Sequence, residues 1–373
     1  MGTREPLPFW IEGLSSVSGA ESFATLRDLV QAARRRLAPY VWDYISGGAE
    51  TETTLRRNRM AWARYAFRPR VLRDVRTRST ATTFLGHPLA SPVMLAPIGN
   101  LGLVHPDGTR TVARAAARRG TIAWISTMSE RSLEEVAEAA GGPLVFQLYV
   151  RGDRAWMRRM VRRVEAVGYL ALCLTVDVPV YGRRERDLQN RFRPREETRR
   201  PNLADIVPDE SYQAALTWED VRWIRDHTAL PLVLKGILAP EDARLAVEHG
   251  VQVVYVSNHG GRQLDYAPAT VDVLSEIVEA VGGRAEVLVD GGVLRGTDVV
   301  KALALGARAA LIGKLQCWAL AAAGQEGVER ALELLQEEIG TTLGLLGVRG
   351  VEEVGPEYLA PYPVEFHGLG RRT

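Results

Sequence analysis

Short apolar runs alternate with helical patterns eight times between residues 93 and 323 of the chain. The apolar runs occupy residues 93–96, 122–125, 144–148, 170–176, 232–234, 251–256, 286–289 and 309–312. Apolar residues at helical spacing follow each run, at residues 106–119, 133–140, 154–167, 218–227, 240–249, 271–281, 297–305 and 315–323. Short continuous apolar runs are typical of strands buried on both faces, as in parallel sheets. Eight strand–helix units in series therefore predict an α/β protein built on a (β/α)8 TIM barrel. A doubly wound sheet is the structural alternative, but eight complete units over about 230 residues favour a closed barrel.

The segments around this repeat predict additions to the barrel within one domain, residues 1–373. Residues 1–91 form an N-terminal prefix, with helical patterns at 22–36, 39–48 and 52–62 and a hairpin-like piece at 77–91. The barrel takes residues 92–326, and residues 327–373 add a helix at 328–346 and a tail that we expect to be extended from Gly355. The connection after the fourth strand, residues 177–217, is long, and such loops are usually lids or disordered segments.

Composition and charge narrow the function classes. Hydrophobic residues make up 46% of the chain, and the net charge is +2. Because positive and negative charges nearly balance, we do not expect a nucleic-acid-binding surface. The sequence contains no apolar run of about 18 residues and no apolar signal core near its start, so we expect neither a membrane span nor secretion. Cys173 and Cys317 lie in apolar segments and are expected to be buried thiols in a reducing cytoplasm. The histidines show no metal-binding spacing, so no metal site is expected.

The stretch at residues 253–265, VVYVSNHGGRQLD, carries the strongest chemical signal. An apolar run leads directly into His259 and Arg262, which places both at the carboxyl end of a strand, where catalytic groups of barrels collect. A histidine three residues from an arginine suggests a proton acceptor beside an anion holder. Taken alone, the stretch is equally well explained by a polar turn with a solvated arginine and a hydrogen-bonded histidine.

The ends of the other predicted strands supply further polar groups to the same rim. They are Pro97, Gly99, Ser126, Gln147, Tyr149, Thr175, Asp177, Lys235, Ser257, Asp290, Gly292, Gly313 and Lys314. Only three lysines occur in this arginine-rich chain, so Lys235 indicates a place where an arginine would not serve. The loops DGGVLRG and IGK after the last two strands have the glycines and basic residues of a phosphate site. Because dinucleotide and nucleoside-triphosphate motifs are absent from the sequence, we predict another phosphorylated organic cofactor. A Schiff-base aldolase built on Lys235 is the main enzymatic rival.

At these residues the chain resembles the FMN-dependent α-hydroxy acid dehydrogenase/oxidase family, which includes glycolate and lactate oxidases, mandelate dehydrogenases and hydroxymandelate oxidases. The matching motifs are WDYISGGAE at 42–50, FRPR at 67–70, FQLY at 146–149, LTVDVP at 174–179, GRRERD at 182–187, LPLVLKGI at 230–237, SNHGGRQLD at 257–265 and DGGVLRGTDVVKALALGA at 290–307. The resemblance covers nearly the whole chain. It implies FMN as cofactor, a small 2-hydroxy acid as substrate, oxidation of the L-2-hydroxy acid to the 2-keto acid, and a homotetramer. The reduced FMN would pass its electrons to oxygen or another acceptor.

The resemblance also implies a role for each matching residue. His259 would be the base, oriented by Asp177, while Arg184 and Arg262 would clamp the substrate carboxylate. Tyr149 would hydrogen-bond the substrate, and Lys235 would stabilise negative charge on the reduced flavin. The flavin contacts would come from Pro97, Gly99, Ser126, Gln147, Thr175 and Ser257, with Asp290, Gly292, Gly313 and Lys314 near the ribityl phosphate.

Three positions depart from the family pattern. Trp42 stands where the family usually has a substrate-binding tyrosine, which leaves open the oxidation of an amine or of a peptide-linked hydroxy acid. Leu294 and Lys314 each stand where the family has a phosphate-binding arginine, and this should weaken phosphate binding. Arg295 could compensate or could face the neighbouring helix. The same two replacements suggest a non-catalytic flavin-binding protein as an alternative, against which the intact base and carboxylate clamp argue.

Three further residues bear on the substrate pocket and the electron acceptor. Gly99 stands where oxidases of the family commonly have alanine and several dehydrogenases have glycine, which weakly favours a dehydrogenase. Met128 and Tyr181 fall where the family lines its substrate pocket, although either could equally be a packing residue.

Overall fold

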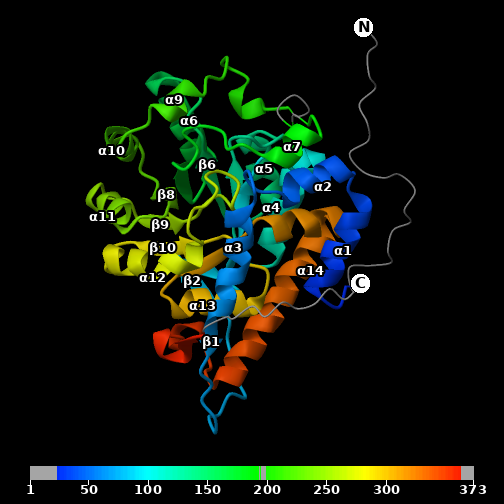
Figure 1. The fold of residues 1–373 in the computed structure, drawn as a ribbon. Helices are drawn as coiled ribbons and strands as arrows, with labels where there is room; N and C mark the ends of the chain where they lie inside the picture. Colours follow the sequence, from blue (N-terminus) through cyan, green and yellow to red (C-terminus); the bar gives the residue numbers. More distant parts are fainter. Residues whose placement is uncertain (1–22, 193, 195–198, 363–373) are drawn as a thin grey trace.

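The computed structural model describes residues 23–192, 194 and 199–362, and it shows a closed barrel of eight parallel strands (Figure 1). Each strand pairs with the next in sequence, and the last pairs with the first to close the barrel. The strands are β4 (Val93–Ile98), β5 (Ala123–Ser126), β6 (Leu144–Leu148), β7 (Ala171–Thr175), β8 (Leu232–Ile237), β9 (Val253–Val256), β10 (Glu286–Val289) and β11 (Ala309–Ile312). The predicted barrel is confirmed, and all eight apolar runs correspond to its strands.

Helices follow the strands as the sequence predicts, and local signals fix several of their ends. They are α4 (Gly108–Arg118), α5 (Leu133–Ala140), α6 (Arg154–Ala166), α10 (Trp218–Asp226), α11 (Pro240–Glu248), α12 (Thr270–Val281), α13 (Gly296–Ala304) and α14 (Lys314–Leu346). The Ser132 hydroxyl accepts a hydrogen bond from the Glu135 backbone N–H, and the Glu135 carboxylate accepts one from the Ser132 backbone N–H. These reciprocal bonds form a capping box at the start of α5. The two helices predicted at 315–323 and 328–346 form one element, α14, interrupted by non-helical backbone at Ala323 and Gly324.

The N-terminal prefix lies along one side and one end of the barrel (Figure 1). It contains α1 (Leu26–Arg36), α2 (Pro39–Ser46), α3 (Thr53–Ala61) and the hairpin of β2 (Thr82–Phe84) and β3 (His87–Leu89). Helix α1 packs along α14. A short strand, β1 (Tyr65–Phe67), pairs antiparallel with β12 (Leu359–Pro361). The tail that we expected to be extended from Gly355 instead begins with a 3-10 turn at Pro356–Tyr358 and becomes extended only in β12. Residues 363–373 lie outside the described part.

The interior of the barrel is filled with side chains, as in other closed barrels. Met94, Trp124, Val145 and Leu288 belong to this inner cluster, which the hairpin extends at the amino end of the strands through Phe84. A second cluster fills the space between the strands and the surrounding helices. Cys173 and Cys317 are both free and buried, so the prediction of two buried thiols is confirmed. Nearest the carboxyl ends of the strands, apolar packing gives way to polar groups.

The long connection between β7 and α10 contains three short helical pieces in its described part. They are α7 (Glu185–Gln189), a 3-10 turn at Pro201–Leu203 and α9 (Ser211–Ala214), while residues 193 and 195–198 lie outside the description. Arg186 in α7 pairs with Glu52 at 2.5 Å and with Asp43 of α2 at 3.4 Å. The buried Asn202 accepts a hydrogen bond from the Leu133 N–H at 2.9 Å. These contacts fasten the connection to the prefix and the barrel.

Within the described residues, no helix has both the length and the apolar character needed to cross a membrane.

Candidate active site

A cavity of about 310 Å³ opens at the carboxyl ends of the strands. Its wall includes the following residues predicted from the sequence: Pro97, Gly99, Ser126, Tyr149, Arg184, Lys235, His259, Arg262, Asp290, Gly292, Gly313 and Lys314. Parallel strands present their carboxyl ends on one face of the barrel, so residues distant in sequence meet there. We call the part around His259, Asp177 and Tyr149 the base end, and the part around Gly292, Leu294, Gly313 and Lys314 the phosphate end.

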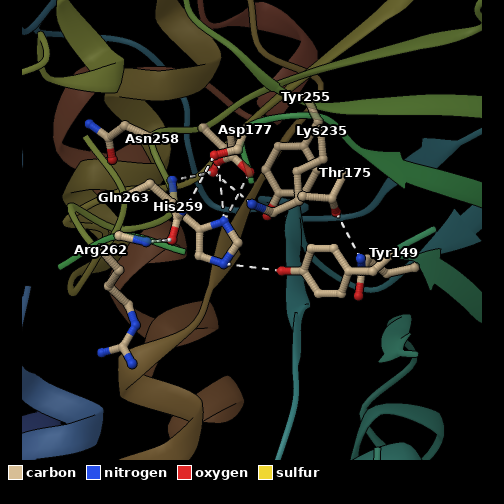
Figure 2. A network of polar contacts seen from close by, with 12 residues as sticks. Tyr149, Thr175, Asp177, Lys235, Tyr255, Asn258, His259, Arg262 and Gln263 are labelled. Carbon is tan, nitrogen blue, oxygen red and sulfur yellow. Dashed lines mark hydrogen bonds and ion pairs between the residues drawn. The ribbon is translucent and has the colours of Figure 1, made fainter. Parts of the chain in front are cut away.

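At the base end, the His259 ring lies between an aspartate and a tyrosine (Figure 2). The Nδ1 atom lies 3.0 Å and 3.2 Å from the two carboxylate oxygens of Asp177. An ionised carboxylate can only accept hydrogen bonds, so Nδ1 carries the ring proton and Nε2 is left as a hydrogen-bond acceptor. The Tyr149 hydroxyl donates to Nε2 over 3.3 Å. The lone pair of Nε2 is therefore on the side of the ring away from the aspartate, where a base must receive a proton.

The electrostatics of this end keep His259 neutral and Asp177 ionised. Burial lowers the pKa of His259, and the nearby Asp177 carboxylate opposes this shift only in part. Burial alone would raise the pKa of Asp177, but His259 and the positive charge of Lys235 hold it below its usual range. A neutral imidazole held in one tautomer by a carboxylate is the form that can accept a proton at neutral pH.

Close backbone approaches make this geometry possible. Gly236 in β8 has a φ of +113°, and a Cβ there would come within 2.6 Å of the Asp177 Cβ. His259 itself has a φ of +57°, in the left-handed region that few residues other than glycine adopt. Gly261 continues this conformation, and a Cβ there would lie 2.6 Å from the Leu55 nitrogen at the start of α3. The glycine pair therefore lets the histidine loop pack directly against the prefix.

Helix α3 holds this loop through two other residues of the SNHGGRQLD motif. The Asp265 carboxylate accepts hydrogen bonds from the N–H groups of Thr54 at 2.7 Å and Thr53 at 3.2 Å, which caps the amino end of α3. The amides of Asn258 and Asn58 bond each other reciprocally at 2.8 Å, both buried. The motif thus serves two purposes: it supplies the base and ties the base to the prefix.

Two arginines line the cavity beside His259. The Arg262 guanidinium extends away from the imidazole in Figure 2 and donates to the carbonyls of Tyr44 at 2.5 Å and Gly47 at 3.1 Å. The Arg184 guanidinium donates to the Tyr181 hydroxyl and lies 4.2 Å from the centre of the Tyr181 ring. Burial and the charge of Arg184 both lower the pKa of Arg262, so two like charges, one buried and one half-buried, face one site. Such a pair is suited to binding a carboxylate.

The structure corrects the prediction for Trp42. Helix α2 lines the cavity with Tyr44, Ile45 and Ser46, whereas Trp42 stacks on Trp318 at 5.7 Å and lies under Arg34. Residues two apart in an α-helix point to nearly opposite faces, so only one of the two can reach the cavity. The Tyr44 hydroxyl accepts a hydrogen bond from the Asn100 amide at 3.1 Å. The WDYISGGAE motif contained this tyrosine, but the sequence alone did not decide which aromatic residue faces inward.

Lys235 lies between the base end and Asp290. Its ammonium donates to the Ser257 hydroxyl at 2.8 Å and lies 3.7 Å from an Asp290 carboxylate oxygen. Burial would lower the pKa of Lys235, but Asp290 and Asp177 raise it, so the charge is retained. The other Asp290 oxygen, Oδ1, is buried and has no hydrogen-bond partner among the described residues. This orphaned acceptor at the cavity wall fits a ligand with hydroxyl donors, such as the ribityl chain of FMN.

Three of the predicted flavin contacts lie beneath the cavity wall. Gln147, Thr175 and Ser257 are each at most 1% exposed. The Gln147 amide accepts from the Ser126 hydroxyl at 2.8 Å and donates to the Thr175 hydroxyl at 2.9 Å. Ser126 reaches the wall, whereas Gln147 and Thr175 do not. The buried residues therefore form a polar floor that orients Ser126 and Lys235.

Met128 and Tyr181 both line the cavity, as the substrate-pocket interpretation expects. A Cβ at Gly99 would come within 2.7 Å of the Met128 Cβ. The glycine at position 99 is therefore required here by the packing of Met128, so it says little about the electron acceptor.

The phosphate end is less completely equipped. Leu294 lines the cavity where the family pattern has an arginine. Arg295 does not compensate, because its guanidinium pairs with Glu338 of α14 at 2.8 Å. Arg59 of α3, which the sequence analysis did not single out, also lines the cavity, but it forms a two-pronged pair with Asp298 at 2.5 Å and 3.1 Å. Lys314 remains, at the first turn of α14.

A closed barrel with an oriented histidine, two arginines and a buried lysine at one rim defines a barrel enzyme that handles protons beside an anionic ligand. The comparison with known families places the chain more exactly: residues 33–361 match the FMN-dependent dehydrogenase family, and the protein belongs to it. The cofactor is therefore FMN, and the orphaned Asp290 oxygen and the loops at the phosphate end fit it.

Relatives with known names support this assignment over most of the chain. An L-lactate oxidase from Nostoc sp. is 45% identical over 88% of this chain and 96% of its own length. A glycolate oxidase from Spinacia oleracea is 42% identical over 88% of this chain and 93% of its own. A mandelate oxidase variant solved with (S)-mandelic acid superimposes with a TM-score of 0.85 at 46% identity, covering 91% of this chain and 98% of that one. A soluble form of (S)-mandelate dehydrogenase from Pseudomonas putida gives a TM-score of 0.87 at 38% identity, covering 90% and 99%.

Proposed function

We propose that this protein oxidises an L-2-hydroxy acid to the corresponding 2-keto acid with FMN, whose electrons then pass to oxygen or another acceptor. The observation that carries the proposal is the placement of His259 Nε2, which is held as an acceptor by Asp177 in a cavity that Arg184 and Arg262 also line. The relatives named as lactate, glycolate and mandelate oxidases act on acids of this class.

Each residue of the base end has a physical task in this reaction. Arg184 and Arg262 bind the substrate carboxylate, which fixes the hydroxyl-bearing carbon relative to the imidazole. His259 takes one of the two protons that the substrate loses, and Asp177 stabilises the resulting imidazolium. Tyr149 donates to the same Nε2 in the absence of substrate and turns its hydroxyl toward the substrate oxygen when a ligand replaces that bond.

Other residues would hold the cofactor. Lys235 would stand at the electron-rich edge of the flavin, where its retained charge stabilises the reduced ring. Pro97, Gly99 and Ser126 line the cavity at the carboxyl ends of β4 and β5, and Asp290 offers its free oxygen to the ribityl chain. When bound, FMN supplies the two-electron acceptor that no amino-acid side chain provides.

The two alternative functions have less support. Oxidation of an amine or a peptide-linked acid was motivated by Trp42, but the cavity is lined by Tyr44 instead. A non-catalytic flavin-binding protein would have no use for the connected set of Asp177, His259 and Tyr149.

We further propose a cytoplasmic homotetramer. The family resemblance supports this assembly, and light scattering of the purified protein coupled to gel filtration tests it. A mass of one or two chains would contradict the tetramer.

Anaerobic reduction of the flavin tests the reaction. Lactate, glycolate and mandelate are mixed separately with the FMN-loaded protein without oxygen, and the loss of the oxidised-flavin absorbance is followed. We expect at least one L-acid, and not its D-enantiomer, to bleach the flavin, and air to restore the colour if oxygen is the acceptor. If the protein carries FMN and none of a broad set of 2-hydroxy acids bleaches it, the proposal is wrong.

A further inference from the structure

Lys314 is the first residue of α14, directly after Gly313 at the end of β11, the eighth strand of the barrel. The loops after the seventh and eighth strands of such barrels frequently form a phosphate site with the amino end of a helix. The lysine ammonium donates to two backbone carbonyls, those of Gly47 and Gly260, each at 3.2 Å. Among the described residues, no carboxylate pairs with it.

The charged groups around Lys314 come from four parts of the chain. Arg262 in the histidine loop and Arg184 before α7 both repel its positive charge. Glu52, before α3, attracts it, but the Glu52 carboxylate is already bonded to Arg186 at 2.5 Å and to the Gly48 N–H at 3.0 Å. Cys317, one turn along α14, has its pKa raised to about 12 by burial, so its thiol stays neutral. The half-buried ammonium is thus surrounded by more positive than negative charge.

The effect on Lys314 follows from this arrangement. Burial lowers the pKa of its amine well below the usual value, and Arg262 and Arg184 lower it further. Two carbonyl oxygens can also accept hydrogen bonds from a neutral amine, so the contacts observed do not require the charged form. An arginine at this position would stay charged at every pH that the protein survives.

We propose that this protein binds FMN together with a proton, which Lys314 takes up as its amine becomes the ammonium partner of the cofactor phosphate. The inference rests on the proposed position of the phosphate at this end of the cavity. Arg262 and Arg184 are assigned to the substrate carboxylate. No further described cation replaces Lys314 in this role, because Leu294 is apolar and Arg295 and Arg59 are each paired with a carboxylate. A family member with arginines at both positions would bind FMN without taking up this proton.

The proposal predicts a specific pH dependence. Where Lys314 is protonated before binding, the FMN dissociation constant does not change with pH. Where the amine is neutral in the free protein but charged in the complex, each pH unit weakens binding by up to about tenfold, because one proton must be added. The phosphate cannot cause this, since its second pKa is about 6 and it is already doubly charged above neutral pH.

The test is a titration of the apoprotein with FMN, followed by quenching of flavin fluorescence, between about pH 7 and about pH 9. Riboflavin, which lacks the phosphate, is the matched ligand control, and Lys314→Arg is the matched protein control. We expect the FMN dissociation constant to rise with pH for the natural protein and to stay flat for Lys314→Arg, with riboflavin binding flat for both. Lys314→Gln, which cannot be charged, should bind FMN weakly and without pH dependence.

Three results would overturn the inference. The first is an FMN affinity of the natural protein that is constant over this range, and the second is an equal pH dependence for the natural protein and Lys314→Arg. The third concerns the phosphate contact itself. Equal affinities for FMN and riboflavin at neutral pH would show that the phosphate does not contact Lys314. Because no substrate is present, the outcome is independent of whether a hydroxy acid bleaches the flavin.

Discussion

The base end and the phosphate end of the same cavity are built with different completeness. At the base end, Asp177, His259 and Tyr149 form a connected chain of hydrogen bonds, and the loop that carries His259 is fixed to α3 by Asn258 and Asp265. At the phosphate end, Leu294 offers no hydrogen bond, and burial together with the charges of Arg262 and Arg184 lowers the pKa of Lys314.

The difference reflects what each end must do. Proton transfer requires a base of the right pKa placed within hydrogen-bonding distance, and few residues other than an oriented histidine meet that requirement. A phosphate can instead be held by backbone N–H groups at a helix start, so the side chains around it can change and the result is a graded loss of affinity. Mutation of the base itself, His259, should therefore act almost all-or-none, whereas mutations at the phosphate end should act gradually.

The largest effect is expected for His259→Gln, which removes the base but retains a hydrogen-bonding side chain. We expect kcat/KM to fall by about 10²–10⁴-fold, the usual contribution of a general base, while FMN remains bound with unchanged absorbance. Steady-state kinetics with the best bleaching substrate and a flavin spectrum measure both. Activity within tenfold of the natural protein would mean that the base lies elsewhere.

The opposite change, adding a group to the phosphate end, tests how incomplete that end is. Leu294→Arg places a guanidinium where the family has one, and a charge-assisted hydrogen bond of about 1.5–3 kcal/mol should tighten FMN binding by roughly tenfold or more. The dissociation constants of FMN and riboflavin for both proteins measure this. Riboflavin affinity should be unchanged, so tightening of both ligands would place the effect outside the phosphate contact.

How well the sequence predicted each end depended on the kind of information required. The barrel and the base set follow from apolar runs and from polar residues directly after them, since a strand fixes which of its residues reaches the carboxyl end. Which aromatic residue of α2 faces the cavity, Trp42 or Tyr44, depends on the rotation of a packed helix that the pattern did not determine. The pairing of Arg295 with Glu338, and that of β1 with β12, involves long-range contacts that no local pattern indicates.

Gln316 lies in the first turn of α14, two residues after Lys314, and a smaller effect is expected there. Its side chain is 1% exposed, and neither amide atom has a hydrogen-bond partner among the described residues. Gln316→Met keeps the length of the side chain and removes the unsatisfied groups, so it should raise the free energy of unfolding by about 1 kcal/mol. Chemical denaturation of the FMN-free protein measures this change. A loss of stability would show that the amide is satisfied in solution.

The smallest effect returns to the base end, where Tyr181 holds Arg184 both by its ring and by its hydroxyl. Tyr181→Phe removes only the hydrogen bond, and because Tyr181 is 41% exposed we expect a contribution near the low end of the usual 0.5–1.5 kcal/mol. The KM of the hydroxy acid should then rise by roughly threefold with little change in kcat, since Arg184 binds the carboxylate before and during the reaction alike.

Tyr181→Leu, which also removes the stacking surface, is the matched comparison and should raise KM further. Riboflavin affinity serves as the control, because riboflavin lacks both the substrate carboxylate and the phosphate. If both variants lowered kcat and left KM unchanged, Tyr181 would act on the reacting atoms and not through Arg184. The base end would then extend further toward solvent than its hydrogen bonds indicate.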